Sequence, residues 1–269
     1  MASRILVAVV GVPVLLLVFY VLPPIWTAVL VALLSMVASY EAGRALRMPQ
    51  PRIRLYGIVL AGCVPFWVFY GQQQLPAICG LLVFVVLVFL EAMASNWRVR
   101  LDQVGGVFFF SLFISFLLSS IVRIGAMELR LAYILLPILI PFLTDAAAML
   151  TGMFFGRHQL APRLSPKKTV EGCLGGFVGG IVPCLIYGLI VHQVLDLNAN
   201  YLLLALYGLL GAAISQVGDL SFSYVKRQNK IKDYGSIFLS HGGVLDRFDS
   251  VIFCAPLVEI LICLLPVFS

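Results

Sequence analysis

The sequence is dominated by stretches of about 20 apolar residues, the length that an α-helix needs to cross the hydrocarbon core of a bilayer. Nine such stretches occur, at approximately residues 5–22, 25–40, 55–70, 75–94, 104–122, 131–150, 172–192, 201–222 and 250–268. In keeping with them, 62% of the 269 residues are hydrophobic and 11% are charged, against about 45–50% and about 25% in an ordinary soluble domain. We therefore expect an all-α, polytopic integral membrane protein with about nine transmembrane helices. A soluble enzyme, a secreted disulfide scaffold and a disordered protein are excluded.

Lysine and arginine residues are distributed unevenly among the loops of this expected topology. With the N-terminus in the cytoplasm and nine alternating spans, 16 of the 18 Lys and Arg residues lie in cytoplasmic segments, and only Arg123 and Arg130 lie outside. The positive-inside rule therefore predicts a cytoplasmic N-terminus. The two longest polar segments, residues 151–171 and 223–249, then both face the cytoplasm. No basic arm lies outside the apolar segments, so nucleic acid is not an expected partner.

Four acidic residues lie inside apolar segments, where an ionisable group is costly and is a candidate for function: Glu91, Asp145, Asp219 and Glu259. Glu91 lies near the end of its span, where its carboxylate can reach water, so a structural role is the simpler interpretation. The roles of Asp145 and Glu259 stay open.

Asp219 differs from these because of the residues that follow it. If its helix continues to Lys230, then Ser223, Lys226 and Lys230 lie within about 40° of Asp219 on the helix surface. An isolated acid at this depth would prefer to be protonated, whereas an acid that binds a divalent cation stays ionised. We therefore expect Asp219 to be a metal ligand.

A second acidic group precedes the ninth span. Asp246 and Asp249 are spaced i, i+3 and share one helix face near a helix N-terminus. A role as a helix cap would explain one of these acids. It does not explain why two acids and Asp219 occur together with five cations, which are Lys226, Arg227, Lys230, Lys232 and Arg247. Carboxylates of this kind suit Mg²⁺, which proteins hold by one or two carboxylates together with substrate phosphates. The preceding Gly242 and Gly243 allow bare backbone amides to approach a phosphate.

The earlier cytoplasmic segment contains a compact basic turn before the seventh span. It combines Ser165, Lys167, Lys168 and Thr169 around a proline. A positive-inside anchor is the alternative interpretation, but it does not explain a proline-restrained turn joined to hydroxyls. We favour phosphate binding here.

Glycines recur at every fourth position of the seventh span, at Gly172, Gly176 and Gly180. Small residues at this spacing let helices approach closely, so we expect a structural role for them.

Two motifs resemble those of a known family. The first is Ser223-x-x-Lys226-Arg227-x-x-x-x-Lys232-Asp233-x-Gly235 followed by His241-Gly242-Gly243-x-x-Asp246-Arg247-x-Asp249, with Gly218-Asp219-Leu220 as its lead-in. The second is Ser165-Pro166-Lys167-Lys168-Thr169-x-Glu171-Gly172. Together they resemble the signature of the phosphatidate cytidylyltransferases (CDP-diacylglycerol synthases), over roughly residues 144–250.

This resemblance implies an enzyme of phospholipid biosynthesis, a nucleotidyltransferase that converts CTP and phosphatidate into CDP-diacylglycerol and pyrophosphate. It implies Mg²⁺ as the cofactor, leaves open a second, monovalent cation, and implies a homodimer. The expected location is the inner (cytoplasmic) membrane of a bacterium, with the active site facing the cytoplasm.

The expected site residues fall into three groups. Asp219 and Asp246 hold the metal. The expected catalytic residues are Lys226, Arg227, Asp249, Ser223 and His241. The expected substrate-binding residues are Lys167, Lys168, Thr169, Ser165, Arg247, Gly242 and Gly243. Residues 1–130 would then form a scaffold of transmembrane helices with dimer contacts, and residues 131–269 the catalytic region with cytoplasmic loops 151–171 and 223–249.

Two other functions stay open. A CTP-dependent polyprenol or lipid kinase would also need metal, cations and a membrane site, but it would release CDP. A transporter could use Asp145, Asp219 and Glu259 as a polar path, although the polar residues gather at one membrane face and no inverted repeat is evident. The P-loop, zincin and serine-hydrolase signatures are absent from the sequence.

Overall fold

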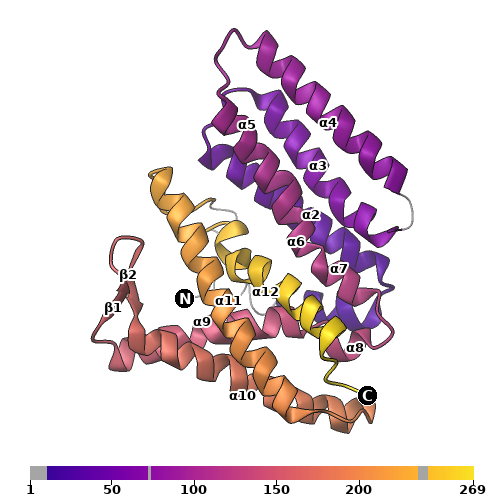
Figure 1. The fold of residues 1–269 in the computed structure, drawn as a ribbon, viewed down its shortest axis with the longest axis vertical. Coiled ribbons are helices and arrows are strands. Elements are labelled where there is room, and N and C mark those ends of the chain that lie inside the picture. The colour runs from indigo at the N-terminus through magenta and orange to yellow at the C-terminus, as the bar shows by residue number, and fades with distance from the viewer. Residues whose placement is uncertain (1–10, 72–73, 236–241) are drawn as a thin grey trace. The chain divides into compact units, whose positions relative to one another are not determined.

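The structure is a computed structural model that describes residues 11–71, 74–235 and 242–269 (Figure 1). It consists of two compact units, the first formed by Met1–Ala126 with Asn229–Arg247 and the second by Met127–Gln228 with Phe248–Ser269. The described residues are mainly helical and contain one two-stranded sheet, so the predicted all-α class is confirmed. Residues 229–247 group with the N-terminal helices in unit 1. The predicted functional division at residue 130 stays a prediction.

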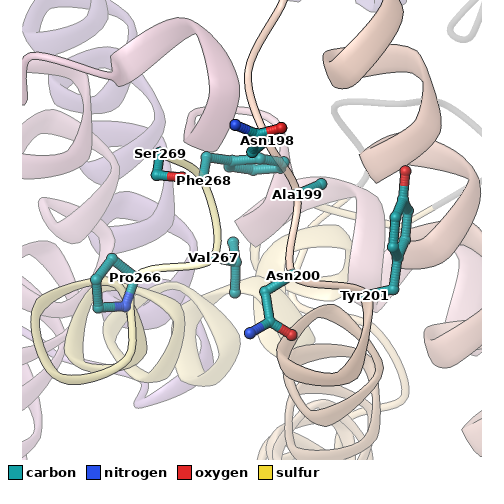
Figure 2. Close-up of a pocket in the computed structure, with 8 residues that line it drawn as sticks. All are labelled: Asn198, Ala199, Asn200, Tyr201, Pro266, Val267, Phe268 and Ser269. Carbon is teal, nitrogen blue, oxygen red and sulfur yellow. The ribbon is translucent and has the colours of Figure 1, made fainter.

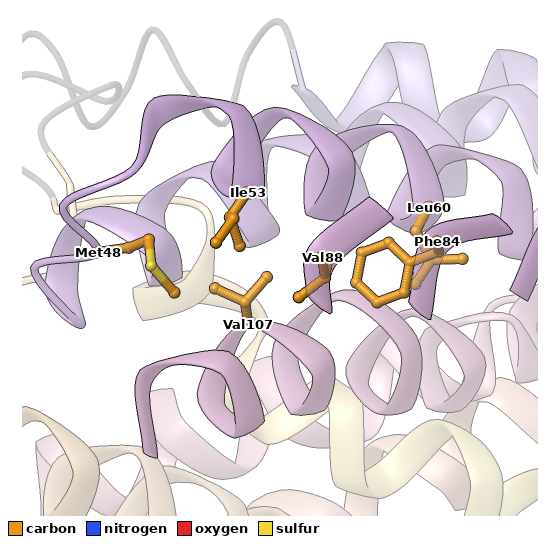
Figure 3. Packing of buried hydrophobic residues seen from close by; sticks show 6 residues of the cluster. All are labelled: Met48, Ile53, Leu60, Phe84, Val88 and Val107. Carbon is orange, nitrogen blue, oxygen red and sulfur yellow. The ribbon is translucent and has the colours of Figure 1, made fainter. Parts of the chain in front are cut away.

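Unit 1 is built from the N-terminal helices. Its elements are η1 (Leu17–Val21), α2 (Ile25–Ala45), α3 (Pro51–Phe69), α4 (Gln74–Ala94), α5 (Leu101–Phe108), η2 (Phe109–Ile114), α6 (Ser115–Leu118) and α7 (Ser120–Gly125). Pro51 begins α3 at a position where its missing N–H costs nothing. A cluster of buried hydrophobic residues lies among α3, α4, α5 and the segment before α3, and Figure 3 shows its members Met48, Ile53, Leu60, Phe84, Val88 and Val107.

Unit 2 contains the longest helices. Its elements are α8 (Arg130–Tyr133), α9 (Leu136–Phe155), β1 (Gln159–Ala161), β2 (Ser165–Thr169), α10 (Val170–Leu195), α11 (Tyr201–Gln228) and most of α12 (Leu245–Leu264). Helix α10 packs along both α9 and α11. A Cβ at Gly172 would lie 2.7 Å from the carbonyl oxygen of Ala148 in α9, and one at Gly180 would lie 2.6 Å from that of Gly208 in α11. The predicted packing role of these glycines is confirmed.

Seven helices in the described part of the chain are long and apolar enough to cross a membrane, so the chain is an integral membrane protein by its architecture. They are Ile25–Ala45, Pro51–Phe69, Gln74–Ala94, Leu101–Gly125, Arg130–Phe155, Val170–Leu195 and Tyr201–Gln228. The first predicted span includes residues 5–10, which lie outside the described residues, and is represented by the shorter helix Gly11–Val21. The ninth predicted span corresponds to helix α12, which is not among the seven. This helix carries Asp246, Arg247, Asp249 and Glu259.

The segment that was expected to be a compact turn before the seventh span is an antiparallel hairpin. Strand β1 pairs with β2 through Gln159 opposite Thr169 and Ala161 opposite Ser165. The hairpin pairs the backbone groups of a polar segment in which Pro166 disfavours a helix. It therefore presents alternate residues of β2 on opposite faces.

Two helix ends also differ from the prediction. Helix α11 ends at Gln228, and Lys230 has the left-handed φ of +55° that is typical of a residue beyond a helix end, so Lys230 is not in the helical stripe. Helix α12 ends at Leu264 rather than near residue 268. Pro266 follows this end, and Phe268 pairs instead with Ala199 in a β-bridge.

Candidate active site

An ion pair joins the hairpin to α11 within unit 2. Lys168 on β2 pairs with Asp219, and their side chains are 26% and 22% exposed. Burial lowers the pKa of Lys168 below its usual value of 10.5, and the charges of Asp145 and then Asp249 partly oppose this shift. The pairing brings together one residue from each of the two sequence motifs.

Two further carboxylates meet at one serine in the same unit. The Ser250 hydroxyl lies 3.1 Å from Asp145 Oδ2 and 3.2 Å from Asp249 Oδ1, so it can donate to either. The Ser250 backbone N–H donates to Asp249 Oδ1 at 2.7 Å. Asp249 and Ser250 are buried. Asp145, whose role was open, therefore lies beside a predicted catalytic residue, and Ser250 was not among the predicted residues.

Helix α11 carries the predicted stripe as far as its last turn. Asp219, Ser223 and Lys226 all lie on this helix, and Ser223 is buried. The charge of Lys226 acts on both Lys168 and Asp249. Arg227 donates from Nε to the carbonyl oxygen of Leu164 at 3.1 Å, so it ties the end of α11 to the hairpin turn.

The base of the hairpin is fixed by two side chains. Thr169 is the N-cap of α10, and its hydroxyl accepts the Gly172 N–H at 3.1 Å. Glu171 Oε2 accepts the N–H groups of Arg157 and His158 at 3.0 and 3.2 Å. Of the predicted phosphate ligands on β2, Lys167 is exposed and Ser165 is partly buried. The hydroxyl of Thr169 therefore has a structural partner, and the phosphate-binding role stays a prediction.

Asp246 lies in unit 1, in the first turn of α12. Its Oδ2 accepts the Gly243 N–H at 2.9 Å and the Tyr234 N–H at 2.8 Å. Gly242 has a φ of +79°, a conformation that favours glycine, and a Cβ there would lie 2.9 Å from Asp246 Oδ2. The predicted glycine turn is thus folded onto Asp246, while Arg247 is exposed. His241 lies outside the described residues.

The chemistry of these donors suits a hard divalent cation. Asp219 and Asp246, the predicted metal ligands, carry the oxygen donors that Mg²⁺ prefers. Among the residues that the structure describes, no group of three or more His, Cys, Asp and Glu side chains is arranged to hold a metal ion. One or two carboxylates with substrate phosphates are the usual Mg²⁺ ligands in phosphoryl-transfer sites, so each of these two carboxylates by itself has the chemistry of such a ligand.

A cavity at the other end of α11 has no part in this cluster. Figure 2 shows its lining, formed by residues 198–201 and 266–269. Helix α11 begins at Tyr201, which lines the cavity. Asp219 lies about 27 Å further along this helix, at 1.5 Å per residue. The cavity contains none of the predicted site residues.

Comparisons with known proteins give a consistent result. The profile of the Cytidylyltransferase family matches residues 2–265. Curated relatives named phosphatidate cytidylyltransferase come from Staphylococcus aureus (strain COL) at 44% identity, Staphylococcus haemolyticus at 42% and Staphylococcus epidermidis at 36%. Each alignment spans 132 residues, which are 49% of this chain and 49% of the relative. The chain thus matches about half the length of these curated relatives.

Proposed function

Because the chain belongs to the cytidylyltransferase family, we propose that it is a phosphatidate cytidylyltransferase, which transfers CMP from CTP to phosphatidate and releases pyrophosphate. The observation that carries this proposal is the ion pair between Lys168 and Asp219, because it joins the two polar motifs in one cluster. Both substrates are anions and one is a lipid, so a mixed cationic and carboxylate cluster next to membrane-spanning helices matches their chemistry.

In this proposal the cations of unit 2 bind the triphosphate. Lys168 is paired with Asp219 before substrate binds, and a phosphate oxygen offers it a second anionic partner. Lys226, about two turns beyond Asp219 on α11, is suited to hold a second phosphate oxygen. Arg227 keeps the hairpin against α11 through Leu164 and so keeps Lys168 in place.

Asp219 and Asp246 are the proposed ligands of Mg²⁺, and a monovalent cation is proposed as a second ion beside it. When bound, Mg²⁺ neutralises charge on the triphosphate and on the departing pyrophosphate. A phosphatidate oxygen forms the new bond to the α-phosphorus as the bond from that phosphorus to the bridging oxygen breaks. The phosphomonoester is largely ionised at neutral pH, so a strong general base is not required.

We also propose that the protein is a homodimer of a bacterial inner membrane, with its site facing the cytoplasm. The excess of Lys and Arg in the predicted cytoplasmic segments supports this orientation.

The experiment that tests the function follows both ends of the triphosphate. Full-length protein in detergent is given phosphatidate, Mg²⁺ and CTP labelled at either the α- or the γ-phosphate. We expect the α-label in a lipid product and the γ-label in pyrophosphate. A γ-labelled lipid with release of CDP would instead identify the CTP-dependent lipid kinase, and absence of turnover in detergent would favour a transporter.

A further inference from the structure

A carboxylate far from both motifs in the sequence binds the start of α12. Glu41 lies in the last turns of α2 and is 1% exposed. Its Oε1 accepts the Val244 N–H and its Oε2 accepts the Leu245 N–H, both at 3.0 Å. The first N–H groups of a helix have no partner within the helix. Glu41 therefore caps α12 from another helix.

The glycine turn within the first motif is packed directly onto this carboxylate. A Cβ on Gly243 or on Gly235 would overlap the Glu41 carboxyl group, so a larger residue at either position would displace that group from its hydrogen bonds. A buried carboxylate with two charge-assisted hydrogen bonds is a strong constraint on its partners. The backbone of residues 243–245 is thus fixed by Glu41.

Asp246 depends on the same short stretch of backbone. Its Oδ2 accepts the N–H of Gly243, the residue next to Val244, and the N–H of Tyr234, next to Gly235. Glu41 and Asp246 therefore bind adjacent backbone groups of one turn within unit 1. Displacement of this turn would alter the direction in which Asp246 presents its carboxylate.

We propose that Glu41 is a positioning residue for Asp246: it fixes the turn at residues 243–245 and so sets the geometry of the carboxylate that receives the divalent cation. This inference rests on the proposed function, because there Asp246 is a metal ligand. Residues that orient metal ligands typically contribute about 10–100-fold to metal affinity or activity.

The experiment measures metal binding separately from turnover. Mn²⁺ binding to full-length protein in detergent is titrated by EPR, and the Mg²⁺ dependence of pyrophosphate release is measured in parallel. The variants are Glu41→Gln, Asp246→Asn and the double variant. The control is Ser39→Ala, which removes a buried hydrogen bond from α2 to Ser111 (2.8 Å) without touching the turn.

We expect Glu41→Gln to weaken Mn²⁺ binding and to raise the Mg²⁺ requirement by about 10–100-fold, with Ser39→Ala unchanged in both. Because Glu41 acts through Asp246, its substitution should add nothing in the Asp246→Asn background. If Glu41 were only a structural cap, Glu41→Gln would weaken Mn²⁺ binding by the same factor in the wild-type and in the Asp246→Asn background. Such additive losses would overturn the inference. A folded Glu41→Gln protein with unchanged Mn²⁺ affinity would also overturn it.

Three further outcomes are covered by the design. If Glu41→Gln does not fold, Glu41→Asp replaces it, with the same expected loss and the same overturning result. If the wild type binds Mn²⁺ through Asp246 but releases no pyrophosphate, the proposed activity fails while the positioning role is still decided by the Mn²⁺ titrations. If Asp246→Asn leaves Mn²⁺ binding intact, the positioning role itself is overturned.

Discussion

Lys168, near the end of a short hairpin strand, forms an ion pair with Asp219, which lies within a membrane-spanning helix. A carboxylate in such a helix needs a counter-charge, and the hairpin supplies one from outside the spans. The same lysine lies in the field of Asp145 and Asp249. The hairpin is therefore an integral part of the candidate site, and substitutions at either end of the pair should affect the same reaction.

Asp219→Asn should reduce the rate of pyrophosphate release from CTP by about 10³-fold, on the scale of removing a principal electrostatic group from an active site. The substitution keeps the shape of the side chain and removes the charge that pairs with Lys168. The rate is measured at saturating CTP and phosphatidate. Asp196→Asn is the matched control, because Asp196 is exposed at the far end of α10 and its φ of +54° also suits asparagine. A near-normal rate for Asp219→Asn would remove this residue from the site.

The lowered pKa of Lys168 predicts a loss of CTP capture at alkaline pH. Burial favours its neutral amine, so its charge is lost at a lower pH than the usual 10.5. We expect kcat/KM for CTP, which reports ionisations of the free enzyme, to fall as the pH rises through that lowered value. In Lys168→Arg the guanidinium stays charged, so the fall should move to higher pH. An unchanged profile in this variant would assign the alkaline ionisation to another group.

The same shift predicts the sign of a stability change. Between the lowered folded-state pKa and 10.5, the unfolded chain binds the Lys168 proton more tightly than the folded chain does. The contribution of Lys168 to the free energy of unfolding therefore increases as the pH rises through this window. Thermal unfolding of wild type and Lys168→Met at several alkaline pH values checks it, since the difference between them should change with pH in that direction.

The helices and the polar stripe that begins at Asp219 could be predicted because they depend on short-range sequence patterns. Apolar runs of the required length identify the spans, and the helical period places Asp219, Ser223 and Lys226 on one helix. The hairpin was not predicted, because residues 159–169 have no strict alternation and its strands are short. Consequently the partner of Lys168 could not be named from the sequence.

Glu41 could not be found for a different reason. The second span was expected to end near residue 40, which placed Glu41 in a polar flank, whereas α2 continues to Ala45 and buries it. Helix α2 can bury the carboxylate because backbone N–H groups of a segment some 200 residues later donate hydrogen bonds to it. Such a long-range contact leaves no local pattern. The only sequence signal was an acidic residue next to an apolar run.

The Asp145–Ser250–Asp249 arrangement predicts a role for a hydroxyl that no sequence motif indicated. Ser250→Ala removes the hydroxyl between the carboxylates but retains the backbone N–H that binds Asp249. We expect turnover to fall by about tenfold, the lower end of the effect of removing a group that orients a site residue. Ser221→Ala is the control, because Ser221 is on α11 and donates only within its own helix, to Val217. Equal turnover in the two variants would show that the hydroxyl does not orient either acid.

The close approach of α10 to α11 predicts that Gly180→Ala destabilises unit 2. A Cβ there would meet the Gly208 carbonyl oxygen at 2.6 Å and the Ala212 side chain at 2.8 Å, and backbone cannot move aside as a flexible side chain can. Overpacking of this kind costs about 1–3 kcal/mol of unfolding free energy. Gly105→Ala is the matched control, since a Cβ at that helical position has no neighbour within 4 Å and alanine favours the helix by about 1 kcal/mol. Thermal unfolding in detergent should therefore move in opposite directions for the two variants, and a shared direction would mean that helix propensity, rather than contact between α10 and α11, decides the outcome at Gly180.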